Sequence, residues 1–346
     1  MEMKVSLIAS AIRAVERVPL PDSATRYGIE ALVGRTRRRL AARPSVDDGR
    51  FARDMAGRSI AEHTAAANKQ HYELPPEFFA LTLGPRRKYS CCLYLTGSET
   101  LAEAEIAALE QTVDHAGLRD GQSILELGCG WGSLTLFMAQ RFPSARIVAV
   151  SNSTPQRLYI QREAAALGLR NIEVITADMN EFTSPPRFDR VVSVEMFEHM
   201  SNWRDLLARI RTWLEPEGRL FAHVFSHRHS PYRFDHRDDA DWIAQHFFTG
   251  GIMPSHGLIS HFPDCFSIER DWRWNGLHYA RTARDWLARF DENRGQIDAI
   301  LSTVYGADAS LWRRRWRLFY FATEGLFGHA GGKEWGVSHY LLRPAG

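Results

Sequence analysis

The stretch that decides the fold is SILELGCGWGS, residues 123–133. It begins with a short apolar run, and glycines follow at positions 128, 130 and 132. An apolar run of this length that ends in glycines predicts a buried strand and then a tight turn. Residues 133–141 continue with a helical pattern. The segment therefore predicts a strand, a glycine turn and a helix in direct succession.

The alternation of short apolar strands and helices continues toward the C-terminus. Further strands are expected at 147–150, 172–176, 191–194 and 220–224, with 335–342 as a last strand, and helices over 155–167 and 203–214. Short apolar strands that alternate with amphipathic helices indicate a parallel sheet with helices on both faces. Right-handed crossovers then give an α/β, doubly wound fold.

Changes in composition along the chain predict four segments. These are an N-terminal helical cap, a sheet core that binds the ligand, an insertion after the fifth strand that covers the ligand edge, and C-terminal strands that complete the sheet. Their predicted bounds are 1–115, 116–225, 226–320 and 321–346.

The overall composition excludes several classes of protein. A formal net charge of +2 gives no nucleic-acid footprint. No apolar run is long enough to span a membrane, and no CxxC pair predicts a metal site. Four cysteines, two of them adjacent, fit a reducing cytoplasm. The basic runs at 35–39 and 313–315 favour solvated helix faces, and contact with an anionic membrane surface is the alternative. A homodimer is a further open possibility.

The glycine turn is the first candidate for a binding site. Ligands of open α/β sheets bind at the carboxyl ends of the strands, where this turn lies. Glycines permit positive φ and a close backbone approach to a ligand. The dinucleotide fingerprint GxGxxG is not met, because Ser133 stands at its last position. On the turn alone, a plain strand-to-helix connection remains an alternative.

The turn and a later strand end together resemble the class I S-adenosylmethionine methyltransferases. The first motif of that class matches Glu126, Gly128, Gly130 and Gly132. Asp178 and Met179 follow the third strand, where the class places an adenine contact. The resemblance implies a mainly parallel, seven-stranded, Rossmann-like sheet and S-adenosylmethionine as the methyl donor.

One departure from the class identifies a branch. The acid that usually ends the second strand is absent, and a turn with Ser151 and Gln156 stands in its place. This turn resembles the branch of cyclopropane fatty acid synthases and coclaurine-type N-methyltransferases, in which the glutamine contacts the donor. Residues 89–91, 196–199, 248–255 and 275–279, together with His223, match further blocks of the branch. The donor contacts that the resemblance implies are Tyr89, Ser90, Glu126, Gly128, Gly130, Trp131, Gly132, Ser151, Gln156, Asp178 and Met179.

Within this branch, two kinds of methyl acceptor remain open, a lipid alkene and an amine. In cyclopropane synthases, the residues that correspond to Cys91, Glu198, His223 and Tyr279 help to hold a bicarbonate, which takes a proton from the methylated carbocation. Those enzymes act on phospholipid acyl chains. They usually have a glycine where this chain has Glu195.

Two stretches of this chain, residues 194–200 and 332–339, resemble the N-methyltransferases more than the cyclopropane synthases. Glu195, Glu198 and His199 have the spacing of one helical face and are expected to bind an ammonium and accept its proton. Aromatic rings such as Trp131 or Phe197 can add cation–π attraction. We therefore expect a small-molecule amine N-methyltransferase, with lipid modification as the alternative. A non-catalytic donor-binding protein is a third hypothesis.

Overall fold

The computed structural model describes residues 15–18, 20–42, 47–62, 74–184, 187–238 and 241–345. Within these ranges, seven strands form one sheet in the order β3-β2-β1-β4-β5-β9-β8. The first five strands pair in parallel, whereas β9 pairs antiparallel with both β5 and β8. Their bounds are β1 Ser123–Leu127, β2 Arg146–Ser151, β3 Ile172–Thr176, β4 Phe188–Val194, β5 Leu214–His227, β8 Phe266–Asn275 and β9 Trp335–Pro344. The doubly wound, mainly parallel fold predicted from the sequence is confirmed.

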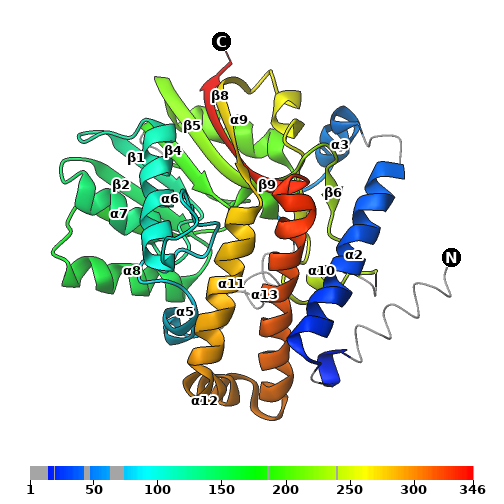
Figure 1. Ribbon diagram of the computed structural model, residues 1–346. Coiled ribbons are helices and arrows are strands. Elements are labelled where there is room, and N and C mark those ends of the chain that lie inside the picture. Colours follow the sequence, from blue (N-terminus) through cyan, green and yellow to red (C-terminus); the bar gives the residue numbers. More distant parts are fainter. Residues whose placement is uncertain are drawn as a thin grey trace.

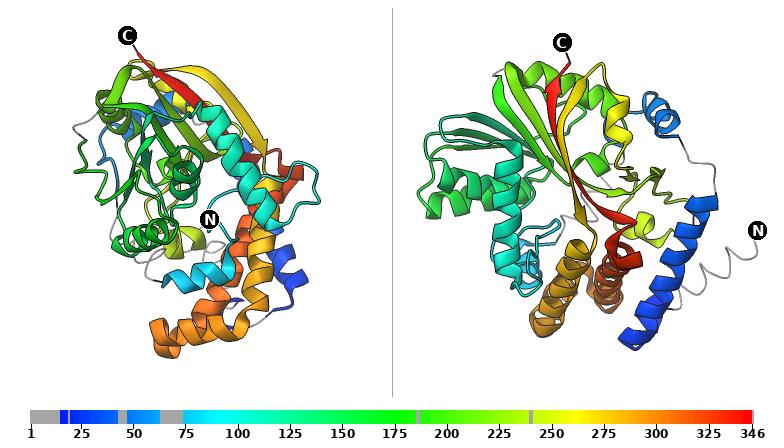
Figure 2. Two further views of the ribbon diagram at one scale, coloured as in Figure 1. Left: turned by 90° about the vertical axis from the view of Figure 1, so that its left-hand side faces the viewer. Right: turned by 45° about the horizontal axis from the view of Figure 1, so that its top comes forward.

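Helices cover both faces of the sheet (Figures 1 and 2). Successive residues of β1 point to opposite faces, since Ile124 packs with α6 and α7 while Leu125 packs with α3 and α9. The bounds of these helices and of the helix after β2 are α3 Asp48–Met55, α6 Leu101–Ala116, α7 Ser133–Arg141, α8 Thr154–Ala166 and α9 Trp203–Trp213. Both faces of the central strands are therefore buried, which explains their continuous apolar sequences.

A bundle of helices extends from one end of the sheet (Figure 1). The long helices α11 and α13 pack together, and α2 lies along α13. The bounds of the helices in this part of the chain are α2 Asp22–Ala42, α5 Pro76–Thr82, α10 Trp242–His246, α11 Leu277–Glu292, α12 Arg294–Tyr305 and α13 Ala309–Gly332. Two short strands, β6 Tyr232–Arg233 and β7 Ile252–Met253, form a separate pair.

The structure corrects the predicted role of the segment 226–320. Strand β8 lies inside that segment and is the seventh strand of the sheet, so the segment is more than a cover. Helix α13 crosses the predicted boundary at residue 320, and only β9 follows it. The sequence of β8 carries charged residues at 269–271 and shows no clean alternation, because this is an edge strand with much of its length exposed.

Arginines of both basic runs form ion pairs with acidic residues of the same chain. Arg313 lies 3.0 Å from Asp298, and Arg315 lies 2.9 Å from Glu16. In the run on α2, Arg37 lies 2.9 Å from Glu334. None of the helices in the described ranges has the length and apolarity needed to cross a membrane. Peripheral membrane contact, a homodimer and a cytoplasmic location stay predictions.

Candidate active site

The glycine turn after β1 is built for close packing and for one open approach. All three of its glycines have positive φ, between 51° and 79°. A Cβ on Gly128 would lie 2.7 Å from Met196, and a Cβ on Gly132 would lie 2.6 Å from Ile160. A Cβ on Gly130, in contrast, would have no atom within 4 Å apart from those of its chain neighbours. Two glycines therefore allow neighbouring segments to approach, while the third leaves space beside the backbone for a ligand.

The turn after β2 presents a buried amide to the same edge of the sheet. Ser153 caps α8 by accepting a hydrogen bond from the backbone of Gln156. The Ser151 hydroxyl donates to Oε1 of Gln156 at 2.6 Å. Nε2 of Gln156 is buried and has no protein partner. A buried donor without a partner indicates a group that is missing from the site.

Two acidic residues of the predicted donor site are held by neighbouring side chains. Glu126 is buried, and its Oε2 accepts a hydrogen bond of 2.5 Å from Thr135 at the start of α7. Burial raises the pKa of Glu126 to about 8. Asp178 accepts hydrogen bonds from the backbone and the side chain of Asn180. Met179 is buried on the α9 face of the sheet.

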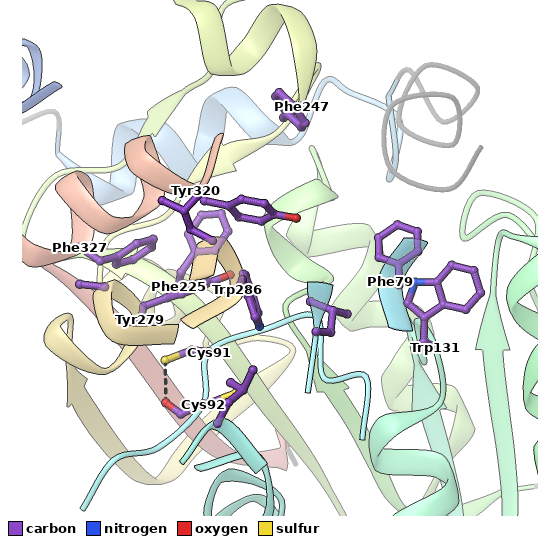
Figure 3. Close-up of a cluster of buried hydrophobic side chains, with 14 of the residues drawn as sticks. Phe79, Cys91, Cys92, Trp131, Phe225, Phe247, Tyr279, Trp286, Tyr320 and Phe327 are labelled. Carbon is purple, nitrogen blue, oxygen red and sulfur yellow. Dashed lines mark hydrogen bonds between the residues drawn. The ribbon is translucent and has the colours of Figure 1, made fainter. Parts of the chain in front are cut away.

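Trp131 lies among aromatic rings next to the turn. Its ring packs 4.8 Å from Phe79 and 5.6 Å from Tyr159, between ring centroids. Its indole N–H is buried and has no protein partner. Tyr89, also predicted at the donor site, packs between Phe79 and Trp286. Figure 3 shows Trp131 and Phe79 together on one side of this aromatic cluster.

The carboxylate of Glu195 is the centre of a second cluster. Its Oε1 accepts a hydrogen bond of 2.9 Å from the backbone N–H of Cys91. The same oxygen lies 3.2 Å from Nε2 of His223, and Oε2 accepts a hydrogen bond of 2.6 Å from the Tyr279 hydroxyl. These partners come from the loop before α6, from β5 and from α11. These contacts therefore join four of the six predicted catalytic residues, and Glu198 is a fifth member of the same cluster.

The predicted helical turn that was to align the acidic residues is wrong. The short helix η1 spans only Phe197–His199, and Glu195 precedes it with φ of 50°. Left-handed backbone of this kind costs a non-glycine residue about 1–2 kcal/mol and is found preferentially at functional sites. The His199 ring lies against Phe248, with 4.4 Å between centroids.

Glu198 is buried beside Glu195. Its Oε1 accepts a hydrogen bond of 2.5 Å from the backbone of Phe225, and its Oε2 is buried without a protein partner. Burial and then the charge of Glu195 raise the pKa of Glu198 well above its ordinary value. A second carboxyl with one free oxygen therefore adjoins the first.

Burial governs the proton equilibria of this cluster. It raises the pKa of Glu195, while Lys88 and the donors Cys91 and Tyr279 oppose that rise. It lowers the pKa of His223 well below 6.5, so the imidazole is neutral. It also raises the pKa values of the Tyr279 hydroxyl and the Cys91 thiol well above their ordinary values. Tyr279 therefore stays protonated and donates a hydrogen bond to Glu195.

Three further residues of the cluster were not predicted from the sequence. The buried Lys88 ammonium donates to Ser90 Oγ and to the Cys91 carbonyl, both at 2.6 Å, and so holds the loop that faces Glu195. His339 of β9 and His115 of α6 extend the hydrogen bonding beyond His223. An isolated lysine or histidine has no local pattern that reveals such a role, because its partners are distant in sequence.

The chain is similar in sequence to a known protein family. Residues 60–328 match the family model described as mycolic acid cyclopropane synthetase. The chain belongs to this family. An (S)-coclaurine N-methyltransferase of Thalictrum flavum subsp. glaucum is 37% identical over 289 residues, which cover 82% of this chain and 80% of that protein. A cyclopropane-fatty-acyl-phospholipid synthase of Escherichia coli is 30% identical over 224 residues, which cover 64% of this chain and 56% of that enzyme.

A solved structure supports the same placement. The crystal structure of a coclaurine N-methyltransferase bound to N-methylheliamine and SAH (S-adenosylhomocysteine) superimposes with a TM-score of 0.91 at 33% identity, over 97% of this chain and 99% of that one. Members of the family with these similarities are S-adenosylmethionine-dependent methyltransferases, and so is this chain. The open side of Gly130 and the unpartnered amide of Gln156 fit the donor.

Proposed function

We propose that this methyltransferase transfers the methyl group of S-adenosylmethionine to the nitrogen of a small amine, with Glu195 as the proton acceptor. One observation carries the proposal. The backbone N–H of Cys91, the Tyr279 hydroxyl and Nε2 of His223 converge on the carboxylate of Glu195. In cyclopropane synthases the corresponding residues help to hold a bicarbonate. A protein carboxylate therefore stands where the lipid-modifying enzymes need a separate anion.

Glu195 has the capacity to accept a proton from an amine. A carboxylate offers about four lone-pair positions, and three donors already use positions on Glu195. The remaining position is available to a substrate N–H. The amine gives its proton to Glu195, and its nitrogen lone pair then attacks the methyl carbon as the carbon–sulfur bond breaks. Glu198, with one oxygen unpartnered, offers a further hydrogen-bonding group beside Glu195 for the nitrogen of the amine.

The donor is an activated methyl group on a sulfonium, and the sheet edge supplies residues to hold it. Gly130 gives a close backbone approach, and the amide of Gln156 and the indole N–H of Trp131 offer hydrogen bonds. Ser90, Tyr89, Ser151, Asp178 and Met179 complete the proposed donor site. Because the leaving group is good, alignment of the nitrogen with the methyl group supplies much of the acceleration.

The surroundings of Glu195 favour an aromatic amine. Figure 3 shows Tyr279, Phe327, Tyr320, Trp286 and Phe225 grouped together above Cys91. Tyr279 stacks on Phe327 with 4.4 Å between ring centroids. Aromatic walls bind both the rings and the cationic nitrogen of such a substrate.

The proposal is tested with labelled donor and two substrate sets, tetrahydroisoquinoline and phenethyl amines on one side and vesicles of unsaturated phospholipid on the other. We expect label in an amine, with no dependence on bicarbonate. Label in the acyl chains that disappears when bicarbonate is removed would instead support the lipid alternative. Donor binding without turnover on either set would support a non-catalytic role.

A single variant sharpens this test. In Glu195→Gly, three donors face an empty place, and glycine accepts the positive φ without strain. We expect amine methylation to be lost and then partly restored by added bicarbonate or acetate. Glu195→Gln, in which the amide fills the same space, is the matched control and should show no restoration. Equal responses of the two variants to bicarbonate would contradict the role given to Glu195.

A further inference from the structure

Three histidines form a row that begins at Glu195 and runs along one face of the sheet. His223 of β5 and His339 of β9 are directly opposite each other in the strand register. Nδ1 of His223 lies 2.8 Å from Nε2 of His339, and Nδ1 of His339 lies 2.8 Å from Nδ1 of His115. The ring of His115 stacks on Trp272 of β8, 3.8 Å between centroids and 8° from parallel. The row therefore spans β5, β9 and the end of α6.

Local sequence features fix the far end of this row. A capping box of Thr100 and Glu103 begins α6, and Gly117 ends it in the left-handed conformation. His115 thus lies in the last turn of the helix, directly above the sheet. Its placement depends on where α6 ends, and on the pairing of β8 with β9 that positions Trp272 opposite His339.

Burial keeps all three rings neutral. It lowers the pKa values of His223 and His339 well below 6.5 and lowers that of His115 as well. Each ring therefore carries one N–H and offers one acceptor nitrogen. In a chain of such rings, the position of the proton on one imidazole determines its position on the next.

The contact between His223 and Glu195 decides in which direction the hydrogen bonds of the row are donated. A backbone N–H and a protonated phenol already donate to this carboxylate, as expected for an ionised group. Nε2 of His223, 3.2 Å away, must then carry its proton, since two facing lone pairs would repel. Nδ1 of His223 consequently accepts from Nε2–H of His339. Nδ1 of His339 in turn accepts from Nδ1–H of His115.

We infer that His339 and His115 are positioning residues, which lock His223 in the tautomer that donates to Glu195 and so keep this base ionised. This role rests on the proposed amine methylation. Neither residue touches the reacting atoms; each acts through the next ring. The titratable or charged groups that face the row from the surrounding elements are Glu195, Glu198, Lys88, Cys91, Tyr279, Asp114 and Arg270.

Kinetics of two substitutions at one position test this inference. His339→Leu removes the donor to His223, and we expect kcat to fall about tenfold or more with little change in KM. The acidic limb of the pH profile should move upward by about one unit, because the ionised form of Glu195 loses support. His339→Gln can still donate an amide N–H, and it should recover most of the rate and the wild-type profile. His256→Leu, which removes a histidine bonded to the adjacent Ser338, is the control and should leave the profile in place.

A spectroscopic measurement is independent of the substrate. In ¹⁵N-histidine spectra of the wild-type protein, His223 and His339 should be protonated at Nε2 and His115 at Nδ1. The His339→Gln variant and a His115→Asn variant identify the signals by their loss. Protonation of His223 at Nδ1, or a His339→Leu enzyme with the wild-type pH profile, would overturn the inference. If no amine is methylated but the tautomers are as stated, the proposed substrate is wrong and the row itself stands.

Discussion

The donor edge and the acceptor cluster of this methyltransferase are assembled in different ways. The donor edge, which is the proposed donor site at the ends of the strands, has a local centre, because residues 126–133 supply a strand end, three positive-φ glycines and the start of a helix. The acceptor cluster is not local, because Cys91, Glu195, His223 and Tyr279 come from four separate parts of the chain. The difference teaches that the methyl donor can be read from one motif, whereas the acceptor chemistry depends on how distant segments meet.

The largest effect is expected at the centre of the acceptor cluster. Glu195→Gln keeps the size of the side chain but removes its capacity to accept a proton. We expect kcat/KM for an amine to fall by about 10²–10⁴, the usual contribution of a general base. Donor affinity, measured by calorimetry, should stay within about twofold, because the donor edge is built separately. A parallel loss of donor binding would show that the two regions are not independent.

A substitution in the donor edge is expected to act on stability. In Gly132→Ala the new Cβ would lie 2.6 Å from Ile160 at a residue with φ of 79°. Strain and the clash together should lower the free energy of unfolding by about 2–4 kcal/mol in urea titrations. Gly121→Ala is the matched control, since Gly121 also has φ of 79° but has open space around its Cβ. In the Gly121→Ala variant the free energy of unfolding should fall by only about 1 kcal/mol.

The pH dependence provides a smaller effect. Burial raises the pKa of Glu195, and the base acts only when ionised, so activity should rise with pH through a value above 4.5. Tyr279→Phe removes a hydrogen-bond donor to the ionised carboxylate. The rise of activity should therefore move to higher pH, and kcat should be about tenfold lower at pH values below that rise. A limb that moves to lower pH would mean that Tyr279 stabilises the protonated form.

The smallest effect is expected at the buried amide of the donor edge. Gln156→Leu removes the unpartnered Nε2 and should weaken donor binding about fivefold, equivalent to about 1 kcal/mol for one hydrogen bond. Ser151→Ala removes the hydroxyl that holds Oε1 but keeps the amide, so it should weaken binding less. Equal losses in the two variants would indicate that orientation of the amide, and not its contact, governs affinity.

The fold was largely predictable because its signals are local and repeated. The five parallel strands carry short apolar runs, helices follow β1, β2 and β4, and the structure has a strand at each of the five predicted places. Strand β8 was not predicted as part of the sheet. It is an edge strand with charged side chains exposed to solvent, so its residues do not need the apolar alternation that marks a buried strand.

The sequence by itself determined the methyltransferase fold and named Glu195, Glu198, His223, Tyr279 and Cys91 as candidates. Only the tertiary structure decided how they meet. Glu195 leaves the predicted helical face because its φ is 50°, and this conformation points its carboxylate at three donors. The histidine row beyond it depends on strand register and on the end of α6. Hydrogen bonds between residues up to 224 positions apart leave no periodic mark in the sequence, and only folding brings their atoms within reach.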